Sequence, residues 1–339
     1  MRLPKRLRLP KIKHLFQNRA LVLMYHRIHS PVTDPWQISV RPDNFKKQMQ
    51  VLRDDYRVIS VDELVKQVQS GNLENGSVAL TFDDGYRDNY ETAKPILEEY
   101  AIPSTFFIPD SYLDSRIPFW WDELEQIIVH TPKLPPAFSV PISGKVMHYD
   151  LGDEAELEDE LRARHAGYKS KAPPSIRTRL YIRLFEVFTS LLTDEQQQLL
   201  DSIREWAGLD REHTRLESGM SSEQLRSLSD HELFTIGGHT RTHPALSSHP
   251  AEVQKSEILK NKRFLEATLD KDVTLFAYPS GLYDNSTVGL LEEHGYSAAF
   301  TTVQDPIVKN TDLLRAGRIH IKDWDGPRFR SALEKMFRQ

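Results

Sequence analysis

The sequence contains no cysteine among its 339 residues. This absence excludes disulfide bonds, thiolate metal sites and cysteine nucleophiles, so that only His, Asp or Glu could hold a metal ion. Long hydrophobic runs are also missing, because no stretch approaches the roughly 18 apolar residues of a membrane span. The charge is nearly balanced, with a formal net value of -5. A balance of this kind indicates no nucleic-acid partner.

The overall composition is that of a soluble globular protein, with 39% apolar and 27% charged residues. Residues 1–19 form a basic arm without acidic residues. The arm lacks the apolar core and cleavage site of a secretory signal peptide, so we expect a cytoplasmic protein. The arm could contact the anionic inner face of a membrane. The alternative is a frayed, solvated arm, because Pro4 and Pro10 both interrupt a helix.

Residues 20–110 alternate between strand-like and helix-like segments, and the alternation returns from residue 221 onward. It is typical of parallel strands covered by helices. Counting the apolar runs gives seven or eight strands. We therefore predict an α/β fold, a deformed (β/α)7-8 barrel that spans residues 20–339.

The alternation of strand-like and helix-like segments stops between residues 111 and 220. We interpret this stretch as a mostly helical insertion into the barrel. This stretch includes "FWWDELEQIIV", a proline-rich segment at 132–141 and an acidic run at 150–160. The acidic run is most simply a solvated helix face.

Two adjacent carboxylates, Asp83 and Asp84, follow the apolar run "VALTF". Like charges repel, and the end of a buried strand is an unfavourable place to hold two of them. A divalent cation would offset the repulsion. One aspartate would then bind the cation, and the other would serve as general base towards water.

A histidine pair, His239 and His243, lies in "LFTIGGHTRTHPAL" at 233–246. The four-residue spacing predicts two imidazoles on one face of a helical turn. Either pair alone is weak evidence, since both patterns are common on protein surfaces. Because each pair follows an apolar strand and adjoins glycine, we interpret them together as an open site with one carboxylate and two imidazoles.

The motifs "TFDDGY" and "GGHTRTHP" resemble the first two motifs of the polysaccharide deacetylases, the NodB-homology family of metal-dependent carbohydrate esterases. The resemblance covers approximately residues 20–110 and 220–320 and implies the deformed barrel. It makes Asp83 the general base, and Asp84, His239 and His243 the metal ligands. The implied cofactor is a divalent metal, with zinc expected and cobalt or nickel as alternatives.

The third family motif departs from the usual pattern, since "FAYPSG" has Ala277 where an arginine is expected. The resemblance assigns oxyanion stabilisation to the backbone N–H at Ser280. We expect Thr240 and Tyr278 to shape the acetyl pocket or to pack beneath it. Arg318 or Arg315 could replace the missing arginine that orients the base, and a structural salt bridge is an equal alternative for each.

The general acid is expected to be His26, which ends the first strand in "LVLMYH". Leu23 and His26 have the spacing of the family's LxxH motif. A histidine ahead of the aspartates is the order found in the circularly permuted poly-N-acetylglucosamine deacetylases, and the sequence resembles that branch. His320 is the alternative acid.

The resemblance implies an enzyme that hydrolyses carbon–nitrogen amide bonds other than peptide bonds, removing N-acetyl groups from a polysaccharide or glycan precursor. Two alternatives stay open: a deformylase or amidase acting on a small or lipid-linked sugar, and a non-catalytic carbohydrate-binding descendant. A glycosidase fits less well, because its two carboxylates must be well separated. Sugar rings stack on aromatic side chains, and the candidates are Trp36, Tyr86, Trp120 and Trp121.

Overall fold

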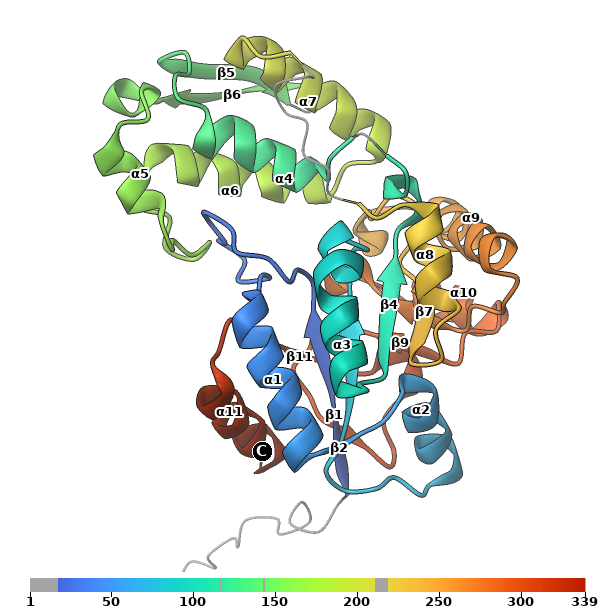
Figure 1. Cartoon of the computed structure of the whole chain (residues 1–339). Coiled ribbons are helices and arrows are strands. Elements are labelled where there is room, and N and C mark those ends of the chain that lie inside the picture. The colour runs from blue at the N-terminus through green and yellow to red at the C-terminus, as the bar shows by residue number, and fades with distance from the viewer. Residues whose placement is uncertain (1–17, 116, 143, 211–218, 339) are drawn as a thin grey trace, which may run out of the picture.

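The computed structural model describes residues 18–115, 117–142, 144–210 and 219–338. A curled sheet of nine strands forms its centre (Figure 1). Its path runs β10-β1-β3-β4-β7-β8-β9, with β11 beside β1 and β2 beside β3. The strands are β1 (Arg19–Tyr25), β2 (Arg57–Val58), β3 (Ser77–Phe82), β4 (Ser104–Ile108), β7 (Phe234–Gly238), β8 (Leu275–Ala277), β9 (Ala298–Phe300), β10 (Ile307–Val308) and β11 (Ile319–His320).

Helices cover the outside of this sheet, as Figure 1 shows. Strands β1, β3 and β4 are buried along their whole length, which explains why they read as continuous apolar runs in the sequence. The covering helices are α1 (Pro42–Asp55), α2 (Val61–Ser70), α3 (Lys94–Tyr100), α8 (Ser222–Ser229), α9 (Ala251–Leu269), α10 (Asn285–Glu293) and α11 (Gly326–Arg338). A π-helical turn, Asn89–Ala93, precedes α3.

The register of the parallel strands brings their carboxyl ends to one edge. Strand β1 pairs in parallel with β3 from Ala20 with Ser77 to Tyr25 with Phe82. On the far side of the sheet, Phe300 of β9 forms a bridge with Ala316, and β11 pairs in parallel with β1. The structure confirms the predicted α/β fold in this coarser form, a curled, barrel-like sheet with helices around it.

One predicted strand differs from the structure. Residues 313–321, "LLRAGRIHI", are one of the apolar runs counted above as strands, whereas the structure has a 3-10 turn, Leu313–Arg315, followed by the short β11. Asp312 causes the turn, because its side chain accepts a hydrogen bond from the Leu314 N–H at 3.0 Å.

The segment between β4 and α8 forms the upper lobe in Figure 1, above the carboxyl ends of the strands. It has its own hydrophobic cluster, built around Trp120, Phe188 and their neighbours. Its elements are α4 (Trp120–Glu125), a π-helical turn (Gln126–His130), β5 (Ala137–Ile142), β6 (Lys145–Asp150), α5 (Asp159–His165), α6 (Ile176–Thr189) and α7 (Thr193–Ala207).

Two details of this lobe correct the sequence analysis. The proline-rich segment is part of a two-stranded antiparallel sheet, in which β5 pairs with β6. The residues of β5 alternate between exposed and buried, a strand pattern that the prolines obscured. The acidic run at 150–160 is not one helix face, because it is divided among β6, a 3-10 turn (Gly152–Ala155) and α5.

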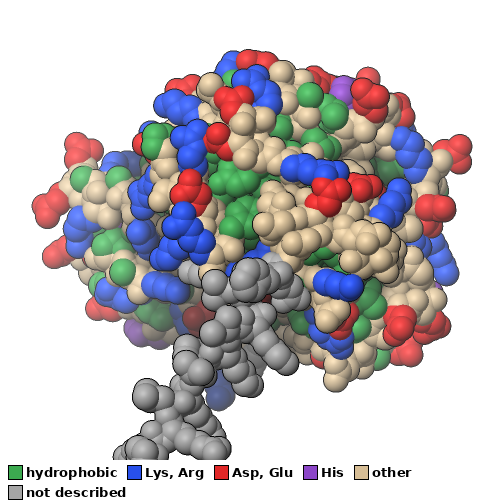
Figure 2. Space-filling model, turned by 90° about the horizontal axis from the view of Figure 1, so that it is seen from below, with side chains coloured by type: hydrophobic (Ala, Val, Ile, Leu, Met, Phe, Trp, Pro, Cys, Tyr) green, Lys and Arg blue, Asp and Glu red, His purple; other side chains and the backbone are tan. Residues whose placement is uncertain are grey.

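The surface seen from below carries Lys, Arg, Asp and Glu side chains interspersed, without a stripe of one sign on this face (Figure 2). This distribution agrees with the small net charge and gives no indication of a nucleic-acid surface there. Among the helices of the described residues, none is long and apolar enough to cross a membrane. Most of the basic arm at 1–19 lies outside the described residues.

Candidate active site

The two adjacent aspartates lie at the carboxyl end of β3, and both are buried. Asp84 has a left-handed backbone with φ 73°, and Gly85 follows with φ 66°. A non-glycine residue in this region stores strain, which is typical of functional sites. Glycine is needed at position 85, because a Cβ atom there would also lie 3.1 Å from Ile108 Cδ1. The tight turn points the two carboxylates in different directions.

The histidine pair follows β7 in an irregular loop, and the predicted helical turn is wrong. Thr240 and His243 have positive φ values of 63° and 62°. The Thr240 hydroxyl accepts the His243 N–H at 3.0 Å and thereby holds the loop. The glycines before the loop allow close packing, since a Cβ on Gly237 would lie 2.5 Å from the Phe107 ring. The imidazoles converge because the loop contains two left-handed residues.

Three potential metal-ligand atoms meet at this edge of the sheet. The Nε2 atoms of His239 and His243 lie 3.4 and 3.3 Å from Asp84 Oδ1, and the three ligand atoms are all within 4.8 Å of one another. Burial, the largest single effect, raises the pKa of Asp84, but its interactions with the neighbouring imidazoles of His239, His243 and His26 together outweigh it, and the pKa is well below its ordinary value. The carboxylate is therefore ionised, as a cation ligand must be.

The tautomer of His239 also fits a cation. Its Nδ1 lies 2.7 Å from the Ala277 carbonyl oxygen, so Nδ1 carries the proton and donates it to this acceptor. Nε2 then presents its lone pair towards Asp84. This arrangement is the usual one for a metal-binding histidine, in which the second ring nitrogen donates to a backbone carbonyl. The donor set of one carboxylate and two imidazoles thus suits a divalent metal ion.

Asp83 forms a buried ion pair with Arg318. The two guanidinium nitrogens donate to the two carboxylate oxygens, each at 2.7 Å, and Arg318 is 0% exposed. Burial, the largest single effect, raises the pKa of Asp83, but Arg318, His239 and His26 together outweigh it, and the pKa lies below its ordinary value. Arg318 also donates to the Thr301 carbonyl at 3.1 Å, which fixes the guanidinium. Arg315, in contrast, is half-exposed and pairs with Asp312.

His26 lies on the other side of Asp83. Its Nε2 is 4.0 Å from Asp83 Oδ2, and its Nδ1 has no hydrogen-bond partner within the part of the chain that the structure describes. The ring of His320 is 6.0 Å away, centroid to centroid. Burial, with a smaller contribution from His26, lowers the pKa of His320 to about 4. His320 is therefore neutral near pH 7, which makes it a poor candidate for the general acid.

Tyr278 and Ser280, the residues of the third motif with an expected role, differ in their exposure to solvent. Tyr278 is fully buried in the main core, and its hydroxyl donates to the Leu314 carbonyl at 2.7 Å. Its ring therefore packs in the core, one of the two placements expected for Tyr278. Ser280 is exposed in a 3-10 turn, Pro279–Gly281, with φ 55°.

Helix α9 holds the histidine loop through two side chains that sequence reasoning missed. Glu257 Oε2 accepts the backbone N–H groups of Arg241 and Thr242 at 3.0 and 2.8 Å. One turn along the helix, Asn261 Oδ1 accepts the His239 N–H at 3.1 Å. The four-residue spacing places both side chains on one helix face, but the sequence carries no signal that this face meets the loop.

Aromatic side chains connect the histidines to the upper lobe. The ring of Trp121 is 4.9 Å from that of His243, and its indole N–H donates to the Tyr86 hydroxyl at 2.6 Å. Trp120 instead stacks on Phe188 inside the lobe. Trp36 packs on Phe185 with ring centroids 4.2 Å apart. Trp36 and Trp120 thus anchor the lobe, whereas Trp121 and Tyr86 border the candidate site.

The chain is similar to known polysaccharide deacetylases in sequence and in fold. The family model described as polysaccharide deacetylase matches residues 70–131 and 206–299. The chain is 31% identical over 112 residues to a poly-beta-1,6-N-acetyl-D-glucosamine N-deacetylase of Staphylococcus epidermidis. That alignment covers 29% of this chain and 39% of the relative, so it spans well under half of the relative's length.

Two solved structures share the fold across nearly the whole chain. The Streptococcus pyogenes deacetylase PplD in complex with acetate has a TM-score of 0.58 at 19% identity, covering 95% of this chain and 99% of that one. IcaB from Ammonifex degensii has a TM-score of 0.57 at 16% identity, covering 95% and 98%. The family match omits residues 132–205, which form most of the upper lobe.

Proposed function

We propose that this chain, which carries a NodB-type polysaccharide deacetylase domain resembling the poly-N-acetylglucosamine branch, is a metal-dependent hydrolase that removes N-acetyl groups from a glycan. One observation supports the proposal above others. Asp84, His239 and His243 converge beside the buried pair of Asp83 and Arg318. Because the Staphylococcus relative is a poly-beta-1,6-N-acetyl-D-glucosamine N-deacetylase, we propose a polymer of N-acetylglucosamine as substrate.

Asp84, His239 and His243 would hold the cation, for which we propose zinc, with cobalt or nickel as alternatives. When bound, such a cation supplies Lewis acidity, which polarises a carbonyl group and makes water more acidic. We also propose that the curled sheet is a deformed (β/α)7-8 barrel, closed through residues 316–320 between β9 and β1. The metal-binding loops would then share the carboxyl-end face, where such barrels carry their chemistry.

The protein's own residues would carry the proton transfers. Asp83 accepts a proton from water as the oxygen attacks the carbonyl carbon of the acetamide, and Arg318 holds this carboxylate in place. The backbone N–H of Ser280 donates to the developing oxyanion. His26 then gives a proton to the nitrogen as the carbon–nitrogen bond breaks. The products are acetate and a free amine on the sugar.

The test of this function is acetate release by the zinc-loaded protein from oligomers of β-1,6-linked N-acetylglucosamine. We expect one molecule of acetate to be released for each free amine that forms on the sugar. The deformylase or amidase alternative would be supported if N-formyl sugars reacted and N-acetyl sugars did not. Binding of the oligomers without any hydrolysis would support the non-catalytic descendant. We propose a cytoplasmic location with membrane contact through the basic arm, which co-sedimentation with anionic vesicles would test.

Arg318 provides a prediction about orientation of the base. Replacing Arg318 with lysine keeps the charge but removes the bidentate contact with Asp83, since an ammonium group is a point donor. We expect turnover to fall by about 10- to 100-fold, because small misplacement of a catalytic group has effects of this size. Steady-state kinetics would measure the change, with Arg315→Lys as the matched surface control. Unchanged turnover in Arg318→Lys would remove the positioning role.

Glu257 provides a prediction about the histidine loop. In Glu257→Ala two backbone N–H groups of the loop lose their acceptor, and we expect zinc affinity to fall by about 10- to 100-fold, as is usual for outer-shell partners of metal ligands. A competitive chelator titration would measure it. Glu257→Gln keeps an acceptor oxygen and should restore most of the affinity, while Glu252→Ala on the same helix should match the parent. An unaltered affinity in Glu257→Ala would show that the loop needs no support from α9.

A further inference from the structure

The imidazole of His26, the proposed general acid, makes no close hydrogen bond within the described residues. Its Nδ1 has no partner there, and its Nε2 lies 4.0 Å from Asp83 Oδ2, which is beyond hydrogen-bond length. The His26 side chain is 16% exposed, so the surrounding side chains do not enclose the ring completely. The direction of the ring therefore depends on how firmly the backbone at residue 26 is held.

The backbone of β1 loses its neighbour β3 at the same level. Strand β1 pairs in parallel with β3 up to Tyr25, and the Asp83 N–H donates to the Tyr25 carbonyl at 3.0 Å. The chain after β3 then turns away, because Asp84 and Gly85 adopt left-handed conformations. Residues 26–28 continue beyond this turn, and the buried polar groups of their backbone need other partners on that side.

Two side chains shortly after the turn supply these partners. The side-chain amide of Asn89 donates to the His26 carbonyl at 2.7 Å and to Asp88 Oδ1 at 3.1 Å. Asp88 Oδ1 also accepts the Ile28 N–H at 2.9 Å. Asn89 is fully buried, and its NH2 group must face these two oxygens, because a carbonyl and a carboxylate both accept hydrogen bonds. The two side chains thus hold the chain at residue 26 and again at residue 28.

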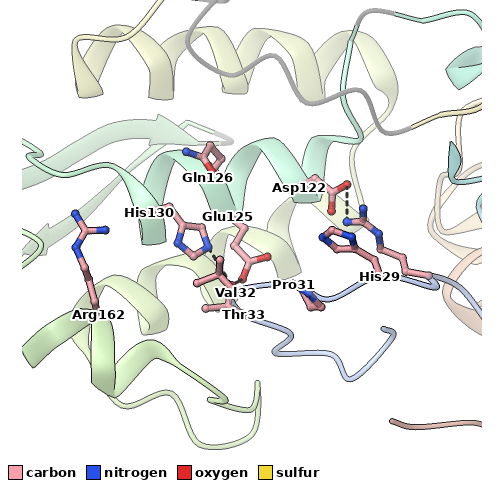
Figure 3. A pocket seen from close by; sticks show the side chains of 10 residues that line it. His29, Pro31, Val32, Thr33, Asp122, Glu125, Gln126, His130 and Arg162 are labelled. Atoms are coloured by element: carbon pink, nitrogen blue, oxygen red, sulfur yellow. Dashed lines mark hydrogen bonds and ion pairs between the residues drawn. The ribbon is translucent and has the colours of Figure 1, made fainter. Parts of the chain in front are cut away.

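Arg27 joins the same arrangement to the upper lobe. Its Nε donates to Asp88 Oδ2 at 3.1 Å, and its guanidinium lies 4.4 Å from the centre of the Tyr86 ring. The guanidinium is also 3.8 Å from Asp122 of α4, and Figure 3 shows this ion pair as a dashed line at Asp122, where α4 faces the loop after β1. Asp88 therefore holds both residues that follow His26, one through its side chain and one through its backbone.

We propose that Asp88 and Asn89 form a clamp that positions His26 towards the nitrogen that leaves the acetyl group. The proposal rests on the proposed deacetylase function and adds two positioning residues to it. The nitrogen of an acetamide needs a proton as the carbon–nitrogen bond breaks, because it is a very poor leaving group as an anion. The oxygen of an aryl acetate leaves as a stabilised anion without this proton. Loss of the clamp should therefore impair amide hydrolysis much more than ester hydrolysis.

The test compares two substrates in the zinc-loaded protein, a β-1,6-linked N-acetylglucosamine oligomer and 4-nitrophenyl acetate. Asn89→Ala removes the donor to the His26 carbonyl, and Asp88→Asn removes the charge that holds Arg27 with little change of shape. We expect turnover of the oligomer to fall by about 10- to 100-fold in each variant, the effect of a misplaced catalytic group, while turnover of the ester stays close to that of the parent. Glu91→Ala is the matched control, because Glu91 is exposed and lies in the same π-helical turn as Asn89.

The outcomes separate the clamp from the proposed function. Equal losses on both substrates in folded protein, or unchanged turnover of the oligomer, would overturn the clamp and leave the deacetylase function standing. Asp88→Asn decides the matter if thermal unfolding shows that Asn89→Ala is not folded.

A wild type that releases no acetate from the oligomer would overturn the deacetylase function instead. The NMR resonance of the His26 ring, identified from its absence in His26→Gln, then decides the clamp. This resonance should shift in Asp88→Asn and keep its position in Glu91→Ala. A resonance that is the same in Asp88→Asn and in the parent would overturn the clamp.

Discussion

Replacing Asp83 with asparagine is expected to reduce deacetylation by about 10²- to 10⁴-fold, the range that a general base contributes. Asparagine has nearly the same shape as aspartate but cannot accept the proton from water at this position. Because Asp83 is the proposed base and not a metal ligand, zinc affinity should change much less than turnover. Acetate release under substrate saturation and a chelator titration would measure the two quantities.

The same variant leaves Arg318 without its ionic partner inside the protein. Removing one member of a buried ion pair costs about 3–5 kcal/mol in other proteins, so a loss of folded protein must be separated from a loss of chemistry. A thermal unfolding curve separates the two, because it gives the fraction of folded protein at the assay temperature. Asp54→Asn is the control, since Asp54 is exposed and pairs with its neighbour Arg53. An Asp83→Asn protein that is folded and retains wild-type turnover would contradict the role as base.

The second large effect is expected at His243. Asparagine is the replacement of choice, because it tolerates the left-handed backbone that His243 adopts at φ 62°. The imidazole is lost while the loop can keep its path. We expect zinc affinity to fall by more than about 100-fold, since even outer-shell changes cost 10- to 100-fold, and turnover should fall with it.

Metal content after dialysis, measured by mass spectrometry, would follow this loss. His249→Asn is a matched control, because His249 follows the same loop but is not among the convergent ligands. Turnover should return in His243→Asn at high zinc concentration if the defect is one of affinity. A variant that retains one zinc ion per chain after dialysis would contradict the ligand role of His243.

The convergence of the site residues could be predicted from the sequence, because each of them follows a strand and parallel strands end at the same edge of a sheet. Asp84 and His239 each follow a buried strand, and the carboxyl ends of parallel strands lie at one edge. Asp83 with His26, at the ends of β3 and β1, meet for the same reason. The resemblance to polysaccharide deacetylases rests on these residues, and the family match and the fold of known deacetylases bear it out.

What the sequence could not predict depends on backbone details of single residues. The spacing of His239 and His243 indicated a helical turn, but positive φ values at Thr240 and His243 produce the convergence instead. Arg315 and Arg318 are three residues apart and equally plausible in sequence. Only the 3-10 turn before β11 decides that Arg318 faces Asp83 and Arg315 faces solvent.

The central claim is that one divalent cation is shared by three side chains from distant parts of the chain. Crystals of the zinc-loaded protein, measured on both sides of the zinc absorption edge, test it most directly. The account predicts a single anomalous peak about 2.0–2.2 Å from Asp84 Oδ1 and from the Nε2 atoms of His239 and His243. A peak held by other residues, or none in protein that releases acetate, would contradict it.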